Sequence, residues 1–439
     1  MSEGASFSLA LTGDSILVRR ASVYQDGPFG KILRVIRDAD LAFTNLEVLP
    51  NDFRGYPAFD SGGSHLGAHA WVLDDLLAMG FDLFAAATNH SLNYSIAGLL
   101  ATMEVLDARG ATYAGIGHNL AEARMPAYLD HPGGTLAMIS CASSFGKGQE
   151  AAEQRPDLPG RPGLNPLRVD RVYEVTPEQL GVLRAIAEEL GLERQRLENV
   201  QLGFGFPPDS PDLFPFLESN FRAAARPAVK TAPKKKDLEA IAAWVREARG
   251  RADTVLVSLH AHEQGDSNEE PAAFIRTFAH RMIDEGADLV VGHGPHLLRG
   301  MELYHGKPAF YSLGNFFGQN ELVYKLPADS YDHFRVDQSK TPGDVYRIRS
   351  EDGQKGFPAD HRYWETLVPL VRFVDGAVQE IELVPVSLGH GEPPHRRGRP
   401  RLAEGAAGTA ILERFAALSK PYGTRLGIGA GRAVVMLDR

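Results

Sequence analysis

The sequence predicts an α/β fold in which an open sheet carries helices on its faces. In the first third of the chain, and again from Asp237 onward, short apolar runs alternate with helical stretches. Each apolar run leads into a polar cluster, at the strand end where α/β folds carry their functional sites. The 439 residues, 44% of them hydrophobic, provide enough apolar surface for one large domain with insertions or for two ordinary domains.

The first third is expected to contain four strands and two helices. The predicted strands are 7–12, 40–44, 81–87 and 112–114, and the predicted helices are 66–79 and 96–109. Three of these strands stop at the triplets Gly13-Asp14-Ser15, Asn45-Leu46-Glu47 and Thr88-Asn89-His90. A further predicted strand, 135–140, leads into Cys141, which we expect to be a buried structural thiol.

We divide the chain into a first half-domain (1–142), an insertion (143–236) and a second half-domain (237–439) with a polar insertion at about 318–365. The first insertion contains one clear helix, which begins at a capping box, Thr176 to Gln179, and ends at Gly191. We interpret this insertion as a lid that folds over the site and selects the substrate. A peripheral subdomain is the alternative.

The second half-domain resumes the alternation of helices and strands. The predicted helices are 237–249, 271–285 and 409–418, the predicted strands are 254–259, 288–291 and 309–312, and two more strands lie within 366–385. The three single strands end in His260-Ala261-His262-Glu263, in Gly292-His293-Gly294-Pro295-His296 and in Leu313-Gly314-Asn315-Phe316. These clusters have the same relation to their strands as those of the first half.

The composition excludes several classes of protein. A formal net charge of −10 argues against a nucleic-acid-binding protein, because phosphates are bound by clustered cations. A single cysteine excludes an intramolecular disulfide and a cysteine-rich metal site. No apolar run reaches about 18 residues, and the N-terminus does not resemble a signal peptide. We therefore expect a cytoplasmic protein without a membrane span. We expect its substrate to be a small molecule or a peptide.

Histidine and acidic side chains gather at the predicted strand ends. The residues in this position are Asp14, Glu47, His90, His260, His262, His293 and His296. Imidazole and carboxylate together suit Zn²⁺, Mn²⁺ or Fe²⁺, and thiolates are not required. One or two such ions would activate water and stabilise the charge that develops in a transition state.

Six motifs follow one another along the chain: GD at 13–14, NLE at 45–47, TNH at 88–90, HAHE at 260–263, GHGPH at 292–296 and YSLGNF at 311–316. In this order they resemble the motifs of the CapA family, which is named for poly-γ-glutamate capsule synthesis. The family is similar to calcineurin-like metallophosphatases, so the resemblance implies a layered sheet sandwich flanked by helices. It implies the metal ligands Asp14, Glu47, Asn89, His260, His262, His293 and His296. It implies catalytic roles for Asp14, Asn89, His90, His293 and His296, with the Asn89–His90 pair acting on the leaving group.

The chain departs from the metallophosphatase pattern at four points. Ser15 follows Asp14, and the histidine of the Asp-x-His block is missing. Glu47 replaces the usual bridging Asp, and Asn93 stands where CapA-like chains usually carry Asp. The fourth block, 260–263, reads His-Ala-His-Glu instead of the commoner His-Trp-Gly. The number of bound ions therefore stays open at one or two.

Three functions stay open at this point. The leading hypothesis is a metal-dependent hydrolase of a γ-glutamyl or peptide-like amide bond, or of an ester bond. The alternative is a metal-independent acid/base enzyme, such as a peptide or amino-acid epimerase, in which Asp14 and either His293 or His296 transfer the proton. A non-catalytic scaffold for capsule polymer is the third, and the absence of a predicted membrane anchor counts against it.

Overall fold

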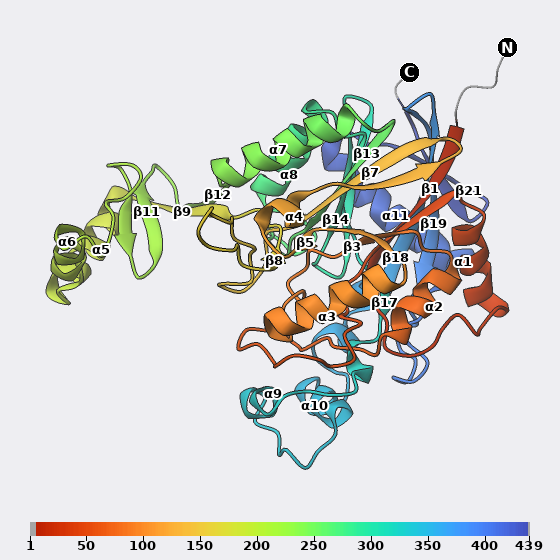
Figure 1. Ribbon diagram of the computed structural model, residues 1–439, viewed down its shortest axis with the longest axis horizontal. Coiled ribbons are helices and arrows are strands. Elements are labelled where there is room, and N and C mark those ends of the chain that lie inside the picture. The colour runs from red at the N-terminus through yellow and green to blue at the C-terminus, as the bar shows by residue number, and fades with distance from the viewer. Residues whose placement is uncertain (1–5, 438–439) are drawn as a thin grey trace.

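The computed structural model describes residues 6–437, which fold around two β-sheets with helices on their outer faces (Figure 1). Apolar side chains from both sheets, including Leu9, Phe43 and Leu289, form one buried cluster and are 0% exposed. The two sheets therefore pack face to face as a sandwich. The predicted layered α/β fold is confirmed.

The larger sheet has ten strands in the order β21-β22-β19-β18-β1-β2-β3-β4, with β17 beside β1 and β20 beside β19. Its strands are β1 (Ser6–Ile16), β2 (Leu41–Asn45), β3 (Leu83–Ala85), β4 (Thr112–Ala114), β17 (Asn315–Gly318), β18 (Glu365–Val374), β19 (Ala377–Ser387), β20 (Arg401–Leu402), β21 (Leu426–Gly429) and β22 (Arg432–Val435). The strands β1 to β4 are parallel, and β18 pairs antiparallel with β1. The carboxyl ends of β1 to β4 therefore meet at one edge of the sheet.

The smaller sheet has six strands in the order β15-β16-β14-β13-β7-β6. Its strands are β6 (Ala127–His131), β7 (Gly134–Ala142), β13 (Thr254–His260), β14 (Leu289–His293), β15 (Leu298–Tyr304) and β16 (Lys307–Leu313). The four central strands are parallel and almost wholly apolar, as expected for a parallel sheet covered on both faces. Cys141 lies in β7 and is buried, and burial raises the pKa of its thiol, so the predicted structural thiol is confirmed.

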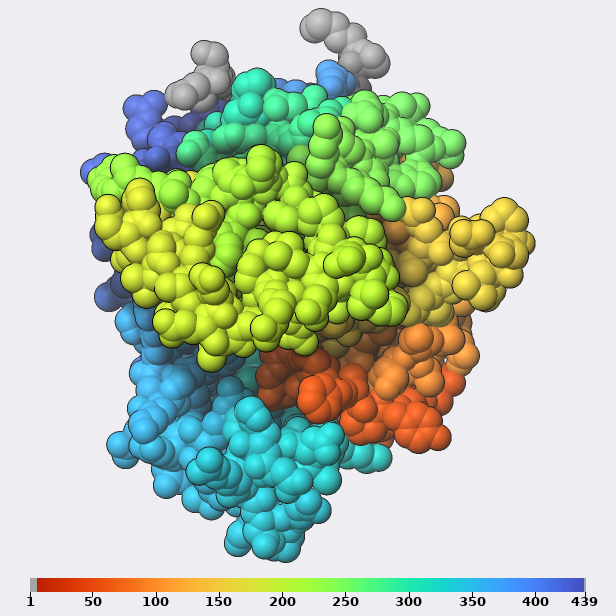
Figure 2. Space-filling model, turned by 90° about the vertical axis from the view of Figure 1, so that its left-hand side faces the viewer, coloured from red at the N-terminus to blue at the C-terminus, as the bar shows by residue number. Residues whose placement is uncertain are grey.

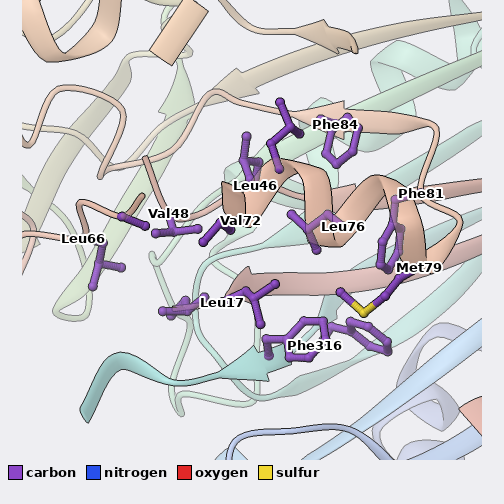
Figure 3. Packing of buried hydrophobic residues seen from close by; sticks show 14 of the residues in the cluster. Leu17, Leu46, Val48, Leu66, Val72, Leu76, Met79, Phe81, Phe84 and Phe316 are labelled. Atoms are coloured by element: carbon purple, nitrogen blue, oxygen red, sulfur yellow. The ribbon is translucent and has the colours of Figure 1, made fainter. Parts of the chain in front are cut away.

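Helices cover the outer face of each sheet. They are α1 (Gly27–Arg37), α2 (Trp71–Met79), α3 (Ser95–Ala108), α4 (Leu120–Arg124), α7 (Lys235–Arg249) and α8 (Ala273–Asp284). The helix α11 (Gly405–Ser419) instead packs its buried side chains into the cluster between the two sheets. Figure 3 shows Leu76 and Met79 of α2 packed against Phe81 and Phe316 beside the larger sheet. Complete burial of each such side chain contributes roughly 1.5–3 kcal/mol.

The first insertion contains a separate small sheet that projects away from the sandwich (Figure 1, yellow-green). Its elements are β9 (Val169–Val175), α5 (Pro177–Glu189), α6 (Leu192–Gln201), β10 (Phe214–Phe216), β11 (Ser219–Ala223) and β12 (Ala228–Pro233). Seen end-on in Figure 2, this subdomain stands nearest the viewer. The short pair β5 (Ile116–Gly117) and β8 (Gly163–Leu164) joins the start of the insertion to the sandwich.

The second insertion is helical, and its residues 319–364, between β17 and β18, contain no paired strand. It holds α9 (Ala328–His333), α10 (Pro342–Arg349) and short 3₁₀ turns at 320–322, 357–359 and 361–364; a further 3₁₀ turn, 420–422, follows α11. It forms a lobe of its own at the lower edge of the molecule in Figure 1 (cyan).

Two helix predictions need correction. The helix predicted from Leu66 begins only at Trp71, because the preceding residues pair with the chain at Leu49, whose N–H donates to the Leu66 carbonyl at 2.8 Å. In the first insertion the capping box at Thr176 is confirmed, but a second helix, α6, follows Gly191. No residue of α6 is buried, so it has no apolar stripe from which to predict it.

Candidate metal centre

The candidate site lies where strands of both sheets end. In the larger sheet Asp14 of β1 is paired with Asn45 of β2 and with Asn315 of β17. In the smaller sheet His260 of β13 is paired with His293 of β14. All three pairings are parallel, so the functional side chains come from neighbouring strand ends, and the loops that follow carry the other candidate ligands.

Two backbone features bring these loops together. A Cβ on Gly13 would lie 1.9 Å from the carbonyl oxygen of Gly314, so only glycine lets β1 approach the start of β17 this closely. His296 has a φ of +60°, a left-handed conformation that costs a non-glycine residue about 1–3 kcal/mol. Such strain persists where the surroundings hold it, and the ring of His296 is held by hydrogen bonds.

Glu47 occupies the centre of the site. It is 1% exposed, and neither oxygen of its carboxylate has a hydrogen-bond partner. Its Oε1 lies 3.8 Å from Nε2 of His90, 3.9 Å from Nε2 of His260 and 3.7 Å from Nε2 of His296. Three imidazole nitrogens thus face one carboxylate oxygen at distances too long for hydrogen bonds.

Asp14 is the hydrogen-bonded carboxylate of the site. Its Oδ1 accepts from Nδ2 of Asn45 at 2.8 Å. Its Oδ2 lies 3.3 Å from the N–H of Gly294 and 3.2 Å from Nδ1 of His296. Burial opposes its ionisation, but the hydrogen bond from His296 and the nearby imidazoles outweigh burial and hold the pKa of Asp14 below its usual value. Asp14 is therefore the site's permanent anion.

Hydrogen bonds select the tautomers of two histidines. Asn93 accepts the N–H of Leu66 with its Oδ1 and donates from Nδ2 to the Ser61 carbonyl, so its amide orientation is set. The same Oδ1 lies 2.8 Å from Nδ1 of His90, which must then be the protonated nitrogen. Likewise Nδ1 of His296 faces the acceptor Oδ2 of Asp14. The Nε2 atoms of both rings face Glu47, and in the neutral ring of His90 this nitrogen carries a lone pair.

The remaining three histidines are tightly packed. Nε2 of His260 and Nε2 of His262 are 3.2 Å apart, close to the separation of about 3.3 Å expected between two nitrogens bound to one tetrahedral ion. His293 is 0% exposed and neither of its ring nitrogens has a hydrogen-bond partner; its Nδ1 is 3.7 Å from Oδ1 of Asp14. A buried imidazole with two free nitrogens requires an explanation, because such groups are normally hydrogen-bonded.

Comparison with known proteins identifies the family of this chain. The family model of the bacterial capsule synthesis protein PGA_cap matches residues 8–320, a range that includes every site residue named above. This chain belongs to the PGA_cap family. The family membership confirms the resemblance drawn from the six sequence motifs.

Individual relatives of this PGA_cap-family chain differ in how much is known of them. Two uncharacterized proteins of Sinorhizobium fredii, y4sH and y4uA, are each 35% identical over 432 residues, which cover 96% of this chain and 91% of the relative. The capsule biosynthesis protein CapA of Bacillus anthracis is 23% identical over 359 residues, 80% of this chain and 69% of that protein. The PGA biosynthesis protein CapA of Bacillus subtilis is 24% identical over 292 residues, 66% of this chain and 56% of that protein. Within residues 6–437 of this chain, no helix has the length and apolar character needed to cross a membrane.

The donors of this PGA_cap-family site fit a divalent cation. Ligand atoms of Asp14, Glu47 and His260 lie within 4.8 Å of one another, and so do those of Glu47, His262 and His296. Two buried carboxylates stand side by side without a paired cation, and the carboxylate of Glu47 has no hydrogen bond at all. A cation in this position would pair both carboxylates and use the free imidazole nitrogens.

The imidazoles are in the protonation state that metal binding requires. Burial lowers the pKa of His90 to about 4, of His262 to about 3 and of His293 to about 4, and it lowers that of His260 well below 6.5. Burial, followed by the charge of Asp14, raises the pKa of Glu47 well above its usual value. At pH 7 the rings are neutral, with lone pairs available to a metal.

These pKa shifts predict how the metal-free protein responds to acid. In the unfolded chain the same imidazoles titrate near 6.5, so below that pH the unfolded state takes up protons that the folded state refuses. We expect the free energy of unfolding to fall as the pH drops from about 6.5 to 5, measured by urea denaturation after chelation. His262→Gln removes one such group and should flatten the slope. An unfolding free energy that stays constant over this range would contradict the prediction.

The deep site opens into a cavity of about 370 Å³. His90, His262 and His296 line its base. Its walls come largely from the second insertion, with Tyr346, Phe357 and the residues around them, and none of its lining residues belongs to 143–236. The first insertion lines a second cavity, through Arg171, Tyr173, Val229 and Thr231, and this cavity shares His262 and Gln264 with the first. The second insertion thus forms the wall of the first cavity, and the lid role predicted for the first insertion stays a prediction.

The structure separates the predicted site residues into two groups. Asp14, Glu47, His90, His260, His262, His293 and His296 are joined by the contacts described above. Asn89 is buried but donates to the Gly62 carbonyl at 3.5 Å, and its Oδ1 has no hydrogen-bond partner. Sequence reasoning missed the side chains of Asn45, Asn93 and Asn315 as the residues that hold Asp14, His90 and His296. All three asparagines lie in or next to the motifs, so their position was a usable signal.

Proposed function

We propose that this PGA_cap-family protein is a metal-dependent hydrolase that cleaves an amide bond, γ-glutamyl or peptide-like, or an ester bond. The observation that carries the proposal is the buried carboxylate of Glu47, which has no hydrogen bond and faces three imidazole nitrogens at 3.7–3.9 Å. Such a group is costly without a cation and useful with one. The substrate is a small molecule or peptide that enters the cavity of about 370 Å³.

The ion would be Zn²⁺, Mn²⁺ or Fe²⁺, one or two in number, held by Asp14, Glu47, His260, His262, His293 and His296. When bound, it supplies Lewis acidity, which polarises the scissile carbonyl and lowers the pKa of water. Asn45 and Asn315 orient Asp14 and the ring of His296 through hydrogen bonds of 2.8 Å and 2.9 Å. Asn89 would join the ligands through its Oδ1, which has no hydrogen-bond partner.

The protein's own proton donor would be His90. Its Nδ1 donates to Asn93, and its Nε2 points into the cavity beside Glu47. A proton taken up at Nε2 from the attacking water can be returned to the leaving group. The pKa of about 4 keeps this nitrogen unprotonated at rest, because burial disfavours the charged ring.

The relatives suggest where to search for the substrate. The Bacillus subtilis relative is described as a PGA biosynthesis protein, so γ-glutamyl amides are the first compounds to test. We expect hydrolysis of γ-glutamyl-p-nitroanilide, a γ-glutamyl dipeptide or a p-nitrophenyl ester to fall at least about 100-fold on chelation. Re-addition of Zn²⁺, Mn²⁺ or Fe²⁺ should restore it. Hydrolysis that survives complete removal of metal would sink the proposal.

A second candidate is a metal-independent epimerase of peptides or amino acids. The observation in its favour is the contact of 3.2 Å between Oδ2 of Asp14 and Nδ1 of His296, a carboxylate and an imidazole in direct contact. Such a pair can remove and return a proton at an α-carbon. Chelated protein incubated with peptides in D₂O distinguishes the two: deuterium at an α-carbon supports the epimerase, and its absence supports the hydrolase.

A further inference from the structure

Arg299 is a buried cation in the wall of the same cavity. It stands in β15, three residues after His296, and its residue surface is 0% exposed. It lines the cavity together with His262 and His296. A fully buried arginine is rare unless an anion pairs with it.

The guanidinium of Arg299 is only partly satisfied. Its Nε donates to the Asn268 carbonyl at 3.0 Å, and its Nη2 donates to the His262 carbonyl at 3.3 Å. Its Nη1 is buried and has no hydrogen-bond partner. Among residues 6–437 it forms no salt bridge, whereas the buried Arg124 is paired with Asp237 at 2.8 Å. Burial lowers the pKa of Arg299 to about 10, which leaves it charged at pH 7.

The other charged side chains in the cavity lining are Glu321, Lys355 and the exposed Arg349. Glu321 at the cavity is neutralised by Arg397, and the rim residue Lys355 is paired with Glu351 at 2.5 Å. Aromatic side chains make up much of the remaining wall: Tyr346, Phe357, Tyr363 and Trp364. The ring of Phe357 meets that of His296 edge to face, with centroids 5.3 Å apart. One buried cation beside aromatic rings suits a singly charged anion on an apolar chain better than a phosphate dianion.

We propose that Arg299 binds a carboxylate of the substrate through Nη1, so that the substrate is a carboxylic acid whose scissile bond lies toward the histidines. The position of the scissile bond in this inference rests on the proposed function. The binding of a carboxylate by Arg299 does not. Two backbone carbonyls hold the guanidinium plane, so Arg299 is oriented before the ligand arrives and loses little freedom on binding.

The test measures binding to full-length, chelated protein, so the proposed metal plays no part. The probes are 4-phenylbutyrate and its amide, which share a shape and differ in charge. By titration calorimetry we expect the carboxylate to bind the native protein at least about tenfold more tightly than the amide does. In Arg299→Gln this advantage should disappear while binding of the amide stays unchanged. Arg124→Gln, which removes another buried guanidinium that is not part of the cavity lining, should keep the full advantage.

Two results would overturn the proposal. One is equal affinity of the carboxylate for the native protein and Arg299→Gln, or no measurable binding to the native protein. The other is binding of inorganic phosphate where the carboxylate does not bind. If Arg299→Gln fails to fold, Arg299→Lys replaces it in the experiment. A lysine cannot keep both carbonyl contacts and also reach the ligand. We therefore expect its affinity for the carboxylate, but not for the amide, to fall several-fold. If Arg299 had only a structural role, its substitution would change the affinities of the carboxylate and of the amide equally. The binding is measured on metal-free protein, so its outcome does not depend on whether the protein is a metal-dependent hydrolase.

Discussion

Glu47→Gln is expected to abolish hydrolysis while making the metal-free protein more stable. Loss of a residue that merely orients a metal ligand costs about 10–100-fold, so loss of the ligand itself should cost more than about 100-fold in activity. The stability should rise because a buried carboxylate with no hydrogen bond, beside Asp14, is replaced by a neutral amide. We expect a gain of about 1–3 kcal/mol in the free energy of unfolding at pH 7, measured by urea denaturation.

The pH dependence of that gain provides its control. The folded-state pKa of Glu47 is raised, so its destabilising effect is absent below the unfolded value near 4.5 and grows as the pH rises above it. The difference in the free energy of unfolding between wild type and Glu47→Gln should therefore fall toward zero near pH 4. A variant that is less stable than wild type at pH 7 would mean that Glu47 has a structural partner, and the account of the site would be wrong.

Asp14→Ala is expected to abolish hydrolysis and also to destabilise the metal-free protein, by about 2–5 kcal/mol. Its carboxylate accepts hydrogen bonds from Asn45 and His296 and lies 3.3 Å from the N–H of Gly294. Alanine removes the acceptor of the Asn45 and Gly294 donors, whereas Nδ1 of His296 keeps Oδ1 of Asn315. Two carboxylates of one site thus differ in the sign of their effect on stability. Urea denaturation of the chelated variants measures both.

Asp75→Ala is the matched control for Asp14→Ala. Asp75 is 1% exposed and accepts from the N–H groups of Ala21 and Ser22, but it lies in α2, away from the metal centre. Its removal should cost comparable stability and leave hydrolysis within a few-fold of wild type. If Asp14→Ala keeps activity, or if Asp75→Ala loses as much activity as Asp14→Ala does, then Asp14 has no special role in the chemistry.

Much of the sandwich and its site was predictable from the sequence, because both rest on local patterns. Apolar runs that end in His or Asp marked β1, β13 and β14, and parallel pairing places His260 beside His293 at neighbouring strand ends. The packing of the two sheets then brings Asp14 of β1 to His293. The pairing of β1 with β17 was not predicted, because residues 315–318 have no polar-apolar alternation. The hydrogen bond between Asn315 and His296 was not predicted for the same reason.

Long-range packing accounts for the features that were not predicted. The chain at 66–70 has helical spacing, but the hydrogen bond between Leu49 and the Leu66 carbonyl holds it extended. Which insertion forms the wall of the first cavity depends on how each folds back: Phe357 of the second insertion meets His296, whereas the first insertion forms its own small sheet. Neither outcome has a signature in composition or periodicity.

The metal content of the purified, untagged protein decides whether the site is a metal centre. Plasma mass spectrometry should find one or two equivalents of Zn, Mn or Fe per chain, lost on chelation and regained on dialysis against the metal. A protein that contains no metal and takes up none on titration would contradict the account. The buried carboxylate of Glu47 would then need another partner, and the Asp14–His296 pair would become the leading candidate for the chemistry.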